Sequence, residues 1–332
     1  MATTVNAAFD EFMAGIVNLD SGETGTARAS RDWLSGQLNG LHQTYTDFPV
    51  PYATMHTYFG SFHRRTKVRP LDDIDLISCL SAEGSTYGTY GNEIRIQVPT
   101  TAERLLSLCH ESTNELNSRK VINQFVNHLA AVPQYRRADI GRDGEAAVLS
   151  LESYPWSFDV VPAMFTKPEY DGRTYFLIPD GNGQWKKADP RIDQDRVTNL
   201  NQARAGYVLA PIRLIKYWNR RPTMPTISSY LIESIILSHY EAGITASQFV
   251  DLEVAPILTS IALAILSSVA DPKGIQGDIN TTPLGDRFAV WARASQDAAV
   301  AGQARQQEVE GNHQESIRLW GTIVGPAFPS FG

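Results

Sequence analysis

The sequence is poor in cysteine, with Cys79 and Cys109 as its two thiols. Two thiols are too few for a zinc ribbon or a disulfide framework, so a reducing cytoplasm suits this chain best. Its seven histidines are scattered, and no HExxH pair for zinc occurs. The P-loop pattern GxxxxGK(S/T), the GxGxxG fingerprint and the GxSxG nucleophile elbow are missing as well. These absences exclude the most common classes of nucleotide-binding enzymes and hydrolases.

The chain also lacks an excess of positive charge, a secretion signal and a membrane span. It has 29 Lys and Arg against 36 Asp and Glu, a net charge of -7. This balance disfavours non-specific binding to phosphate backbones, and we expect no constitutive DNA binding. The N-terminus has no basic region followed by an apolar run. The longest apolar stretch, 254–270, contains Pro256 and is shorter than the roughly 20 residues that a span needs, so we expect no membrane contact.

The pattern of apolar residues predicts helices at both ends of the chain and strands between them. Helical spacing predicts two opening helices over 4–19 and 24–44, and one further long helix over 101–131. Residues 173–190 predict a hairpin. From Ile192 onward the periodicity is helical, with a break expected at Pro256. Alternating and β-branched runs predict strands at 54–59, 73–80, 93–98, 135–139, 146–152 and 156–161.

These elements predict an α+β fold with two lobes. The 332 residues are long enough for a large core, and 42% hydrophobic residues is typical of a packed protein. We expect a mixed-sheet core lobe with the N-terminal helices over 1–190, a helical lobe over 191–324 and an extended tail over 325–332. An active-site cleft is expected between the two lobes.

The run Asp73-Ile74-Asp75-Leu76-Ile77 alternates acidic with apolar residues. A strand would therefore place both carboxylates on one face and the aliphatic side chains in the core. Like charges about 5–7 Å apart are unfavourable unless a cation lies between them, and hard divalent ions with oxygen ligands are the usual solution. Asp159 interrupts a second apolar strand pattern, 156–161. Three carboxylates on adjacent strands can bind two Mg²⁺ ions, which is the arrangement that phosphoryl transfer needs.

Gly60-Ser61 precedes the acidic strand and directly follows a predicted strand. A glycine lets the backbone approach a phosphate, and backbone N–H groups with the Ser61 hydroxyl can donate to its oxygens. A basic run from His63 to Arg69 adds positive charge nearby. Taken singly, the acidic pair could be a surface loop, Asp159 a hydrogen-bonded strand residue, and the basic run a solvated face. What favours a metal-dependent phosphate site is the combination, in this order, of a Gly-Ser turn, an acidic strand and a further acidic strand residue.

These motifs resemble the polymerase-β-like nucleotidyltransferase superfamily, and specifically the bacterial cGAS/DncV-like enzymes (CD-NTases). The resemblance rests on Gly60-Ser61, on Asp73-Ile74-Asp75 and on the run 158–163 (FDVVPA). It continues in 214–219 (LIKYWN), in 228–233 (SSYLIE) and in the Asp-Pro loop 271–274 (DPKG). It therefore touches segments from about residue 56 to residue 275, in the order found in the family.

The resemblance implies an enzyme, its site residues and its substrates. Asp73, Asp75 and Asp159 would be the catalytic residues and hold two Mg²⁺ ions, with Mn²⁺ as an alternative. Gly60 and Ser61 would contact the triphosphate, and Lys216 with Ser229 would bind the donor phosphates. The substrates would be nucleoside triphosphates, ATP and GTP. The product would be a purine-containing cyclic di- or trinucleotide such as cyclic GMP-AMP, made in bacterial antiviral (CBASS-type) signalling.

Two other functions and one departure stay open at this point. The same carboxylates would serve a nucleotidyltransferase that modifies tRNA or protein, and an inactive nucleotide-binding scaffold could keep the fold. Animal members of the family carry a zinc-binding insertion and basic DNA-binding surfaces, which two cysteines and a net charge of -7 do not support. Activation by DNA is therefore not expected here.

The tail 325–332 contains two prolines and two phenylalanines and ends on Gly332. The prolines should keep it extended, and the phenylalanines have no obvious core to join. One interpretation is a frayed terminus. The other follows from the resemblance, because some relatives are conjugated by E1/E2-like partners through a C-terminal glycine. A slim residue is what such an activating site must accept, so Gly332 is the expected point of attachment.

Overall fold

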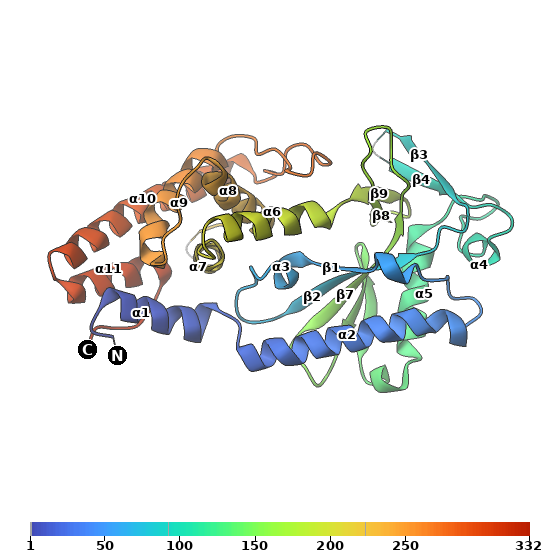
Figure 1. Ribbon diagram of the computed structural model, residues 1–332, viewed down its shortest axis with the longest axis horizontal. Helices are drawn as coiled ribbons and strands as arrows, with labels where there is room; N and C mark the ends of the chain where they lie inside the picture. The colour runs from blue at the N-terminus through green and yellow to red at the C-terminus, as the bar shows by residue number, and fades with distance from the viewer. Residues whose placement is uncertain (1, 92, 223) are drawn as a thin grey trace. The chain divides into compact units, whose positions relative to one another are not determined.

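The chain forms two compact units in a computed structural model that describes residues 2–91, 93–222 and 224–332. The sheet unit consists of Ser21–His63 and Leu71–Arg191. The helical unit consists of Met1–Asp20, Arg64–Pro70 and Ile192–Gly332. The predicted α+β class, with a mixed sheet in one part and helices in the other, is confirmed (Figure 1).

The units divide the chain differently from the boundaries expected at residues 190 and 324. The first twenty residues and the segment Arg64–Pro70 belong to the helical unit. The physical reason lies in the first helix, α1 (Val5–Phe12), which buries Phe9 and Phe12 in the hydrophobic core of the helical unit. Burial of these two phenyl rings in the helical core stabilises the position of α1 there, although its sequence is adjacent to that of the sheet unit.

The sheet unit has four α-helices, of which two are only four residues long, and nine strands among the described residues. They are α2 (Ser21–Thr44), β1 (Thr57–Phe59), α3 (Gly60–His63), β2 (Asp73–Leu80), β3 (Thr86–Tyr90), β4 (Glu93–Gln97), α4 (Glu103–Leu106), α5 (Ser118–Ala130), β5 (Asp139–Asp143), β6 (Ala146–Ser150), β7 (Ser157–Phe165), β8 (Phe176–Pro179) and β9 (Trp185–Ala188). The main path of the sheet runs β1-β2-β7-β8-β9-β4-β3, and β5 and β6 branch from β7.

Strand β7 is the centre of this sheet. It pairs in parallel with β2 along the whole of that strand, from Asp73 to Leu80. On its other side, β6 pairs antiparallel with the first half of β7 and β8 pairs antiparallel with its end. The β8–β9 hairpin predicted from 173–190 is confirmed. Because β7 has neighbours along both of its edges, residues in β2 and β7 are fixed in register relative to each other.

The two faces of β2 and β7 pack differently. On one face, Ile77 and Cys79 of β2 join Val161 and Ala163 of β7 in a small apolar cluster. Helix α5 packs against β5, β6, β7 and β8, and α2 packs against β2. Alternate residues such as Ile74 and Phe158 are buried on the opposite face from that cluster. The acidic residues of β2 and β7 lie on the same face as this apolar cluster, next to its end.

The long helix predicted over 101–131 is wrong. The structure has the short α4, then a polar connection, and then α5. In the connection, Cys109 and Leu116 pair in an antiparallel bridge, and Asn117 caps α5 by accepting from the amides of Arg119 and Lys120. Side chains such as that of Asn117 bond the backbone locally and so end one helix and begin another. Strand β3 was not predicted, and the strand expected at 135–139 begins at Asp139 instead.

The helical unit contains α1, a π-helical turn and six further helices among the residues that the structure describes. They are the turn Met13–Val17, α6 (Pro190–Ala203, whose first two residues belong to the sheet unit), α7 (Leu209–Asn219), α8 (Ser229–Glu241), α9 (Val250–Ile265), α10 (Leu284–Val309) and α11 (His313–Val324). Of these described helices, none combines the length and the apolar character that crossing a lipid bilayer requires.

The break predicted at Pro256 does not occur, and α9 continues through that residue. Pro256 lies on the exposed side of the helix. Leu252, whose carbonyl group loses its intrahelical N–H donor at Pro256, is exposed as well, so water can replace that donor. A proline on the buried face would have left that carbonyl group unpaired in the core.

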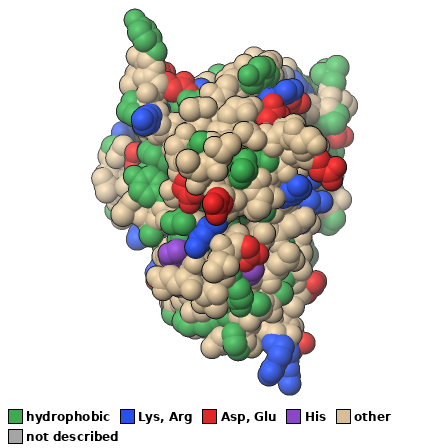
Figure 2. Space-filling model, turned by 90° about the vertical axis from the view of Figure 1, so that its right-hand side faces the viewer, with side chains coloured by type: hydrophobic (Ala, Val, Ile, Leu, Met, Phe, Trp, Pro, Cys, Tyr) green, Lys and Arg blue, Asp and Glu red, His purple; other side chains and the backbone are tan. Residues whose placement is uncertain are grey.

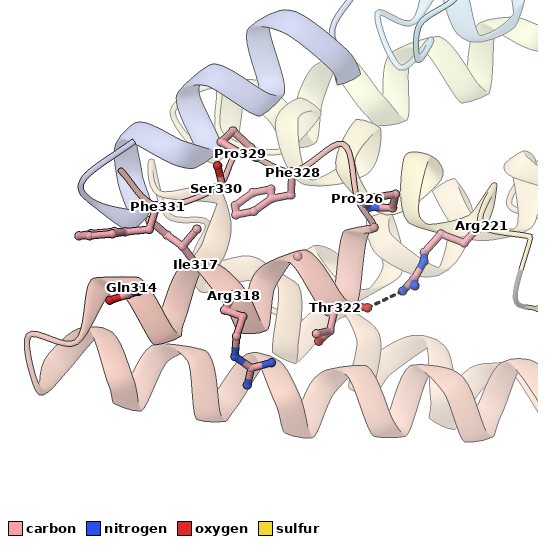
Figure 3. A pocket seen from close by; sticks show the side chains of 12 residues that line it. Arg221, Gln314, Ile317, Arg318, Thr322, Pro326, Phe328, Pro329, Ser330 and Phe331 are labelled. Atoms are coloured by element: carbon pink, nitrogen blue, oxygen red, sulfur yellow. Dashed lines mark hydrogen bonds between the residues drawn. The ribbon is translucent and has the colours of Figure 1, made fainter. Parts of the chain in front are cut away.

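The tail over 325–332 packs against the helical core, so the interpretation as a frayed terminus is wrong. Phe328 is buried, with its ring centroid 5.0 Å from that of Phe9 and 5.2 Å from that of Phe12. The sequence offered no core for this phenylalanine because the residues that surround it come from the other end of the chain. Figure 3 shows Phe328 turned toward the body of the unit, beside Pro329.

The two ends of the chain are also joined through their backbones. Ala2 and Phe331 form a parallel bridge, and the Gly332 amide donates to the Ala2 carbonyl oxygen over 3.3 Å. Phe331 keeps 41% of its side chain exposed, and Gly332 is exposed as well. The tail is thus anchored by Phe328, while its last two residues stay accessible.

Charges of both signs are mixed on the surface that Figure 2 shows. On this face, Lys and Arg side chains alternate with Asp and Glu side chains and with hydrophobic groups. Within the sheet unit, Arg95 pairs with Glu93 and Glu115 at distances of 3.6 and 3.7 Å. Exposed pairs of this kind contribute little to stability.

Phe328→Ala should destabilise the helical unit by about 3–5 kcal/mol, because it removes a buried ring between two others. Phe331→Ala, in the same tail, should change the unfolding free energy by less than about 1 kcal/mol because Phe331 lies outside the core and is 41% exposed. Denaturant unfolding monitored by circular dichroism measures both. Equal effects of the two substitutions would contradict the anchoring role of Phe328.

Candidate active site

Three carboxylates lie on one face of the central strand pair. Asp75 on β2 is the register partner of Asp159 on β7, and Asp73 is the partner of Ser157. Side chains of register partners on neighbouring strands project to the same side, and so do residues two apart on one strand. Asp73, Asp75 and Asp159 therefore share a face. The alternation of acidic and apolar residues predicted this for Asp73 and Asp75, and the strand register adds Asp159. All three are half-buried, whereas Ile74 and Phe158 between them are buried.

Gly60 lies against the carboxylate of Asp75. It follows β1, whose last residue Phe59 pairs with Asp75, and it begins the short helix α3 that contains Ser61. A Cβ atom at Gly60 would lie 1.7 Å from Asp75 Oδ2, which is far inside van der Waals contact. The φ of Gly60 is 73°, in the left-handed region that favours glycine. The Gly-Ser turn and the acidic strand are thus parts of one local structure.

The three carboxylates have the chemistry of a site for a hard divalent cation. Carboxylate oxygens are the ligands that Mg²⁺ prefers, and repulsion between neighbouring carboxylates falls when a cation binds between them. Gly60 lies so close to Asp75 that no side chain could fit between them. This keeps the Asp75 carboxylate uncovered by the side chain of the neighbouring strand, as a ligand site requires. Across residues 2–91, 93–222 and 224–332, no three or more His, Cys, Asp or Glu side chains are arranged so that they could hold a metal ion as they stand. The strand register and the donor chemistry carry the metal assignment, which stays a prediction.

Lys216, on α7 of the helical unit, is buried and paired. Its Nζ donates to Glu233 Oε1 on α8 over 2.7 Å. The Thr66 hydroxyl donates to the same oxygen over 2.9 Å, and Arg64 Nε donates to Glu233 Oε2 over 3.1 Å. Lys216 is 3% exposed and Glu233 is 2% exposed. A carboxylate this deeply buried is stable in its charged form because several donors surround it.

The charges of this cluster affect one another. Burial alone would raise the pKa of the Glu233 carboxyl, but Arg64 and Lys216 together hold that pKa below its usual range. Burial lowers the pKa of the Lys216 ammonium, Glu233 opposes this effect, and Arg64 and Lys67 reinforce it. Glu233 is therefore the group that favours the charged form of Lys216.

Ser229 is the first residue of α8 and is exposed. It precedes Glu233 by four residues, so the two side chains lie on the same face of the helix one turn apart. The ammonium of Lys216 contacts that same face through Glu233. The N-terminus of α8, with its unpaired N–H groups and its positive dipole end, is suited to bind anions.

The structure thus brings the predicted residues together in two groups. Gly60, Ser61 and the three aspartates belong to the sheet unit. Lys216 and Ser229 belong to the helical unit. The predicted convergence of the two groups on one triphosphate stays a prediction.

Sequence reasoning did not assign a role to Glu233, Arg64 or Thr66. A signal was present for Glu233, because it is an acidic residue within the apolar run YLIESII of α8. A buried charge in such a run needs a partner, and Lys216 has the same property on α7. Nothing in the local sequence identifies Arg64 and Thr66 as the further donors, because they lie 169 and 167 residues away from Glu233.

Two cavities lie away from these residues. One, of about 580 Å³, lies in the helical unit between α11 and the tail, where Figure 3 shows Arg221, Arg318 and Phe331 around it. The other, of about 420 Å³, lies in the sheet unit and is lined by residues such as Tyr87 and Phe165. Neither has any of the predicted site residues in its lining.

Solved structures share this fold. CdnC of E. coli MS115-1, solved with ATP, matches with a TM-score of 0.70 over 97% of this chain and 98% of that chain, at 15% sequence identity. The cyclic AMP-GMP synthase DncV of Vibrio cholerae, solved with the linear intermediate 5′ pppA(3′,5′)pG, matches with a TM-score of 0.69 over 99% of this chain and 98% of that chain, at 11% identity. The two-part α+β architecture is therefore that of the cGAS/DncV-like nucleotidyltransferases.

A sequence relative identifies the family. No protein-family model matches the chain. A protein of Bacillus cereus (strain VD146) named probable cyclic nucleotide synthase is 42% identical over 331 residues, which cover 99% of each chain. The chain belongs to the cyclic nucleotide synthases of the bacterial cGAS/DncV-like family. It is an enzyme, a nucleotidyltransferase.

Gly60→Ala should reduce product formation at least a hundredfold, because the new methyl group cannot share space with the Asp75 carboxylate. Gly172→Ala is a matched control, since Gly172 has a φ of 79° and nothing within 4 Å of the added Cβ. Both substitutions should carry backbone strain of about 1–2 kcal/mol. Rates of cyclic nucleotide formation would be compared, and an equal loss in both variants would show that strain alone is responsible.

Proposed function

We propose that this enzyme joins nucleoside triphosphates, ATP and GTP, into a purine-containing cyclic di- or trinucleotide such as cyclic GMP-AMP. A ribose hydroxyl of one nucleotide attacks the α-phosphorus of another, the P–O bond to the β-phosphate breaks, and pyrophosphate leaves with that electron pair. The attacking hydroxyl loses its proton to solvent. A second such step within the linear intermediate closes the ring.

The side chains of the sheet unit and of the helical unit would have different tasks. Asp73, Asp75 and Asp159 would hold two Mg²⁺ ions, with Mn²⁺ as an alternative. When bound, divalent ions lower the pKa of the attacking hydroxyl and neutralise charge on the phosphates. Gly60 keeps the backbone close to Asp75, and Ser61 follows it as the second residue of α3. The backbone N–H group of Gly60 and the Ser61 hydroxyl would donate to triphosphate oxygens. These groups orient the triphosphate, and orientation supplies much of the rate enhancement.

Lys216 and Ser229 would bind the donor phosphates. Lys216 has three N–H donors, and among the described residues its one hydrogen-bond acceptor is Glu233. A buried ammonium with donors to spare favours an anionic ligand. Ser229 at the start of α8 adds a hydroxyl and a helix N-terminus, both of which favour phosphate.

The single observation that carries the proposal is the pairing of Asp75 with Asp159 beside Gly60. Neighbouring carboxylates repel each other, and a divalent cation bound by both relieves that repulsion. The relative from Bacillus cereus named probable cyclic nucleotide synthase supports cyclisation over the modification of tRNA or protein. The linear intermediate bound by DncV supports a stepwise route through an open dinucleotide. We place the product in bacterial antiviral (CBASS-type) signalling.

The direct test is to incubate the protein with the four ribonucleoside triphosphates and Mg²⁺, digest with phosphatase and identify the products by mass spectrometry. A phosphatase-resistant cyclic nucleotide containing adenine or guanine is expected. Omission of one triphosphate at a time identifies the bases. Transfer of nucleotide to added tRNA or protein without a small cyclic product would contradict the proposal.

Replacing both Asp73 and Asp75 with Asn should abolish product formation while the protein stays folded, because amides bind divalent cations far more weakly than carboxylates. The matched control replaces Asp139 and Asp143, on the outer strand β5 of the same sheet, with Asn. That pair makes the same change in charge, and its variant should keep near-normal turnover. Substantial activity in the Asp73/Asp75 variant would overturn the two-metal assignment.

Gly332 is proposed to be joined through its carboxylate to an amine by an E1/E2-like partner. The anchoring of the tail at Phe328 and the exposure of Gly332 support this, because they hold an accessible end at the surface of the helical unit. Mass spectrometry after co-expression with such a partner should show a mass increase in the wild type and none after deletion of Gly332. An unchanged mass in both, with the partner active on its own substrate, would contradict conjugation.

A further inference from the structure

Glu233 connects three separate parts of the helical unit. It lies on α8, and its two carboxylate oxygens accept from Lys216 on α7 and from Thr66 and Arg64 in the segment 64–70. Its side chain is 3% exposed, as is that of Lys216. Within this cluster Glu233 is the one anion, and the charged groups that act on the Lys216 ammonium are Glu233, Arg64 and Lys67.

A buried ion pair of this kind seldom exists for stability alone. Removing two charges from water is costly, and well-packed apolar residues often stabilise a core as well or better. Lys216 Nζ gives one of its three hydrogen bonds to Glu233, and the residues described by the structure accept neither of the other two. The pair fixes where those two donors can point.

We propose that Glu233 is a positioning residue of the active site, which holds the Lys216 ammonium in place and in its charged form so that its remaining N–H groups bind triphosphate oxygens. This inference rests on the proposed function, because it takes Lys216 as a phosphate ligand. Glu233 itself would not touch substrate, since an anion beside phosphate is repelled. Its effect reaches the nucleotide through Lys216.

Glu233 achieves this in two ways. The 2.7 Å hydrogen bond restricts a flexible four-carbon side chain to one position, so less conformational entropy is lost when a phosphate binds. Its negative charge also opposes the effect of burial, Arg64 and Lys67 on Lys216. Without that charge, the buried ammonium would release its proton at a lower pH, and a neutral amine binds phosphate weakly.

The test measures binding of the α,β-methylene analogues of ATP and GTP by calorimetry across a pH range, together with KM and kcat for product formation. Glu233→Gln should weaken analogue binding and raise KM by about tenfold or more, the effect of disturbing a hydrogen bond to a charged group. Analogue binding should also be lost at a lower pH as the solution is made more alkaline. A purely structural role for Glu233 would not move that loss.

Three further variants make the result decisive. Lys216→Ala and the double variant Lys216→Ala/Glu233→Gln should bind the analogues equally weakly, because a residue that acts through Lys216 has no effect once Lys216 is gone. Asp297→Asn is the matched control: Asp297 is also buried and also contacts α7, through the Trp218 indole at 2.7 Å, and pairs with Arg293 at 2.7 Å. This variant should lose stability but keep the wild-type affinity and pH profile.

The outcomes separate this inference from the proposed function. Wild-type affinity and an unmoved alkaline limb in Glu233→Gln would overturn the inference, as would additive effects in the double variant. Should Glu233→Gln fail to fold, Glu233→Asp decides: it keeps the charge but shortens the reach, and weaker binding with an unmoved limb is expected. Analogue binding by the wild type without any cyclic product would overturn the proposed function and leave the role of Glu233 to be decided by affinity. Failure of the wild type to bind either analogue would overturn both.

Discussion

Parallel pairing of β2 with β7 is the constraint on which the candidate site depends. The register sets Asp75 beside Asp159, and the alternation of the strands sets Asp73 on the same face. A shift of one residue in either strand would turn carboxylates into the core and aliphatic side chains out to solvent. Buried residues on both sides of β2, such as Ile74 and Ile77, make that shift costly. The apolar packing of the sheet thus secures an arrangement of like charges that is unfavourable in itself.

The antiparallel neighbour of β2 adds a second constraint at the same place. Strand β1 pairs Phe59 with Asp75, so the chain must turn directly beside the carboxylate. Glycine is required at that turn both for its φ of 73° and for the absence of a Cβ atom. The two requirements coincide at Gly60, and they explain why a short Gly-Ser pair in the sequence carries information about an aspartate fifteen residues later.

Local sequence patterns predicted those helices and strands in which apolar residues recur regularly along one face. The alternation in 73–77 predicted both the strand and the shared face of its carboxylates, and the apolar spacing from Ile192 onward predicted the helices of the second unit. Predictions failed where a polar connection interrupted a helical pattern, as between α4 and α5, and where the exposed side of a helix tolerated Pro256. The spacing of apolar residues shows neither the polar connection nor the exposed position of Pro256, because both depend on which groups reach solvent.

Most contacts between distant segments could not be predicted from local patterns. The place of Phe328 among Phe9 and Phe12 depends on the meeting of the two ends of the chain. The roles of Glu233 and Arg64 depend on the return of the segment 64–70 to α8. Single residues in the sequence, such as a lysine or glutamate in an apolar helix, indicate that a partner exists but not which residue it is. Residue patterns and the resemblance to a family supplied the site residues, and the structure showed which groups contact them.

Neither unit is a continuous piece of the chain, and this affects how the protein can be made. The helical unit takes Arg64–Pro70 from within the sequence of the sheet unit. Arg64 meets Glu233 across 169 residues, so during synthesis it leaves the ribosome well before its partner. At about 5–20 residues per second, the delay is roughly 10 to 30 seconds. Throughout that interval the basic segment has to stay soluble without its carboxylate, and the helical unit cannot close until translation is almost complete.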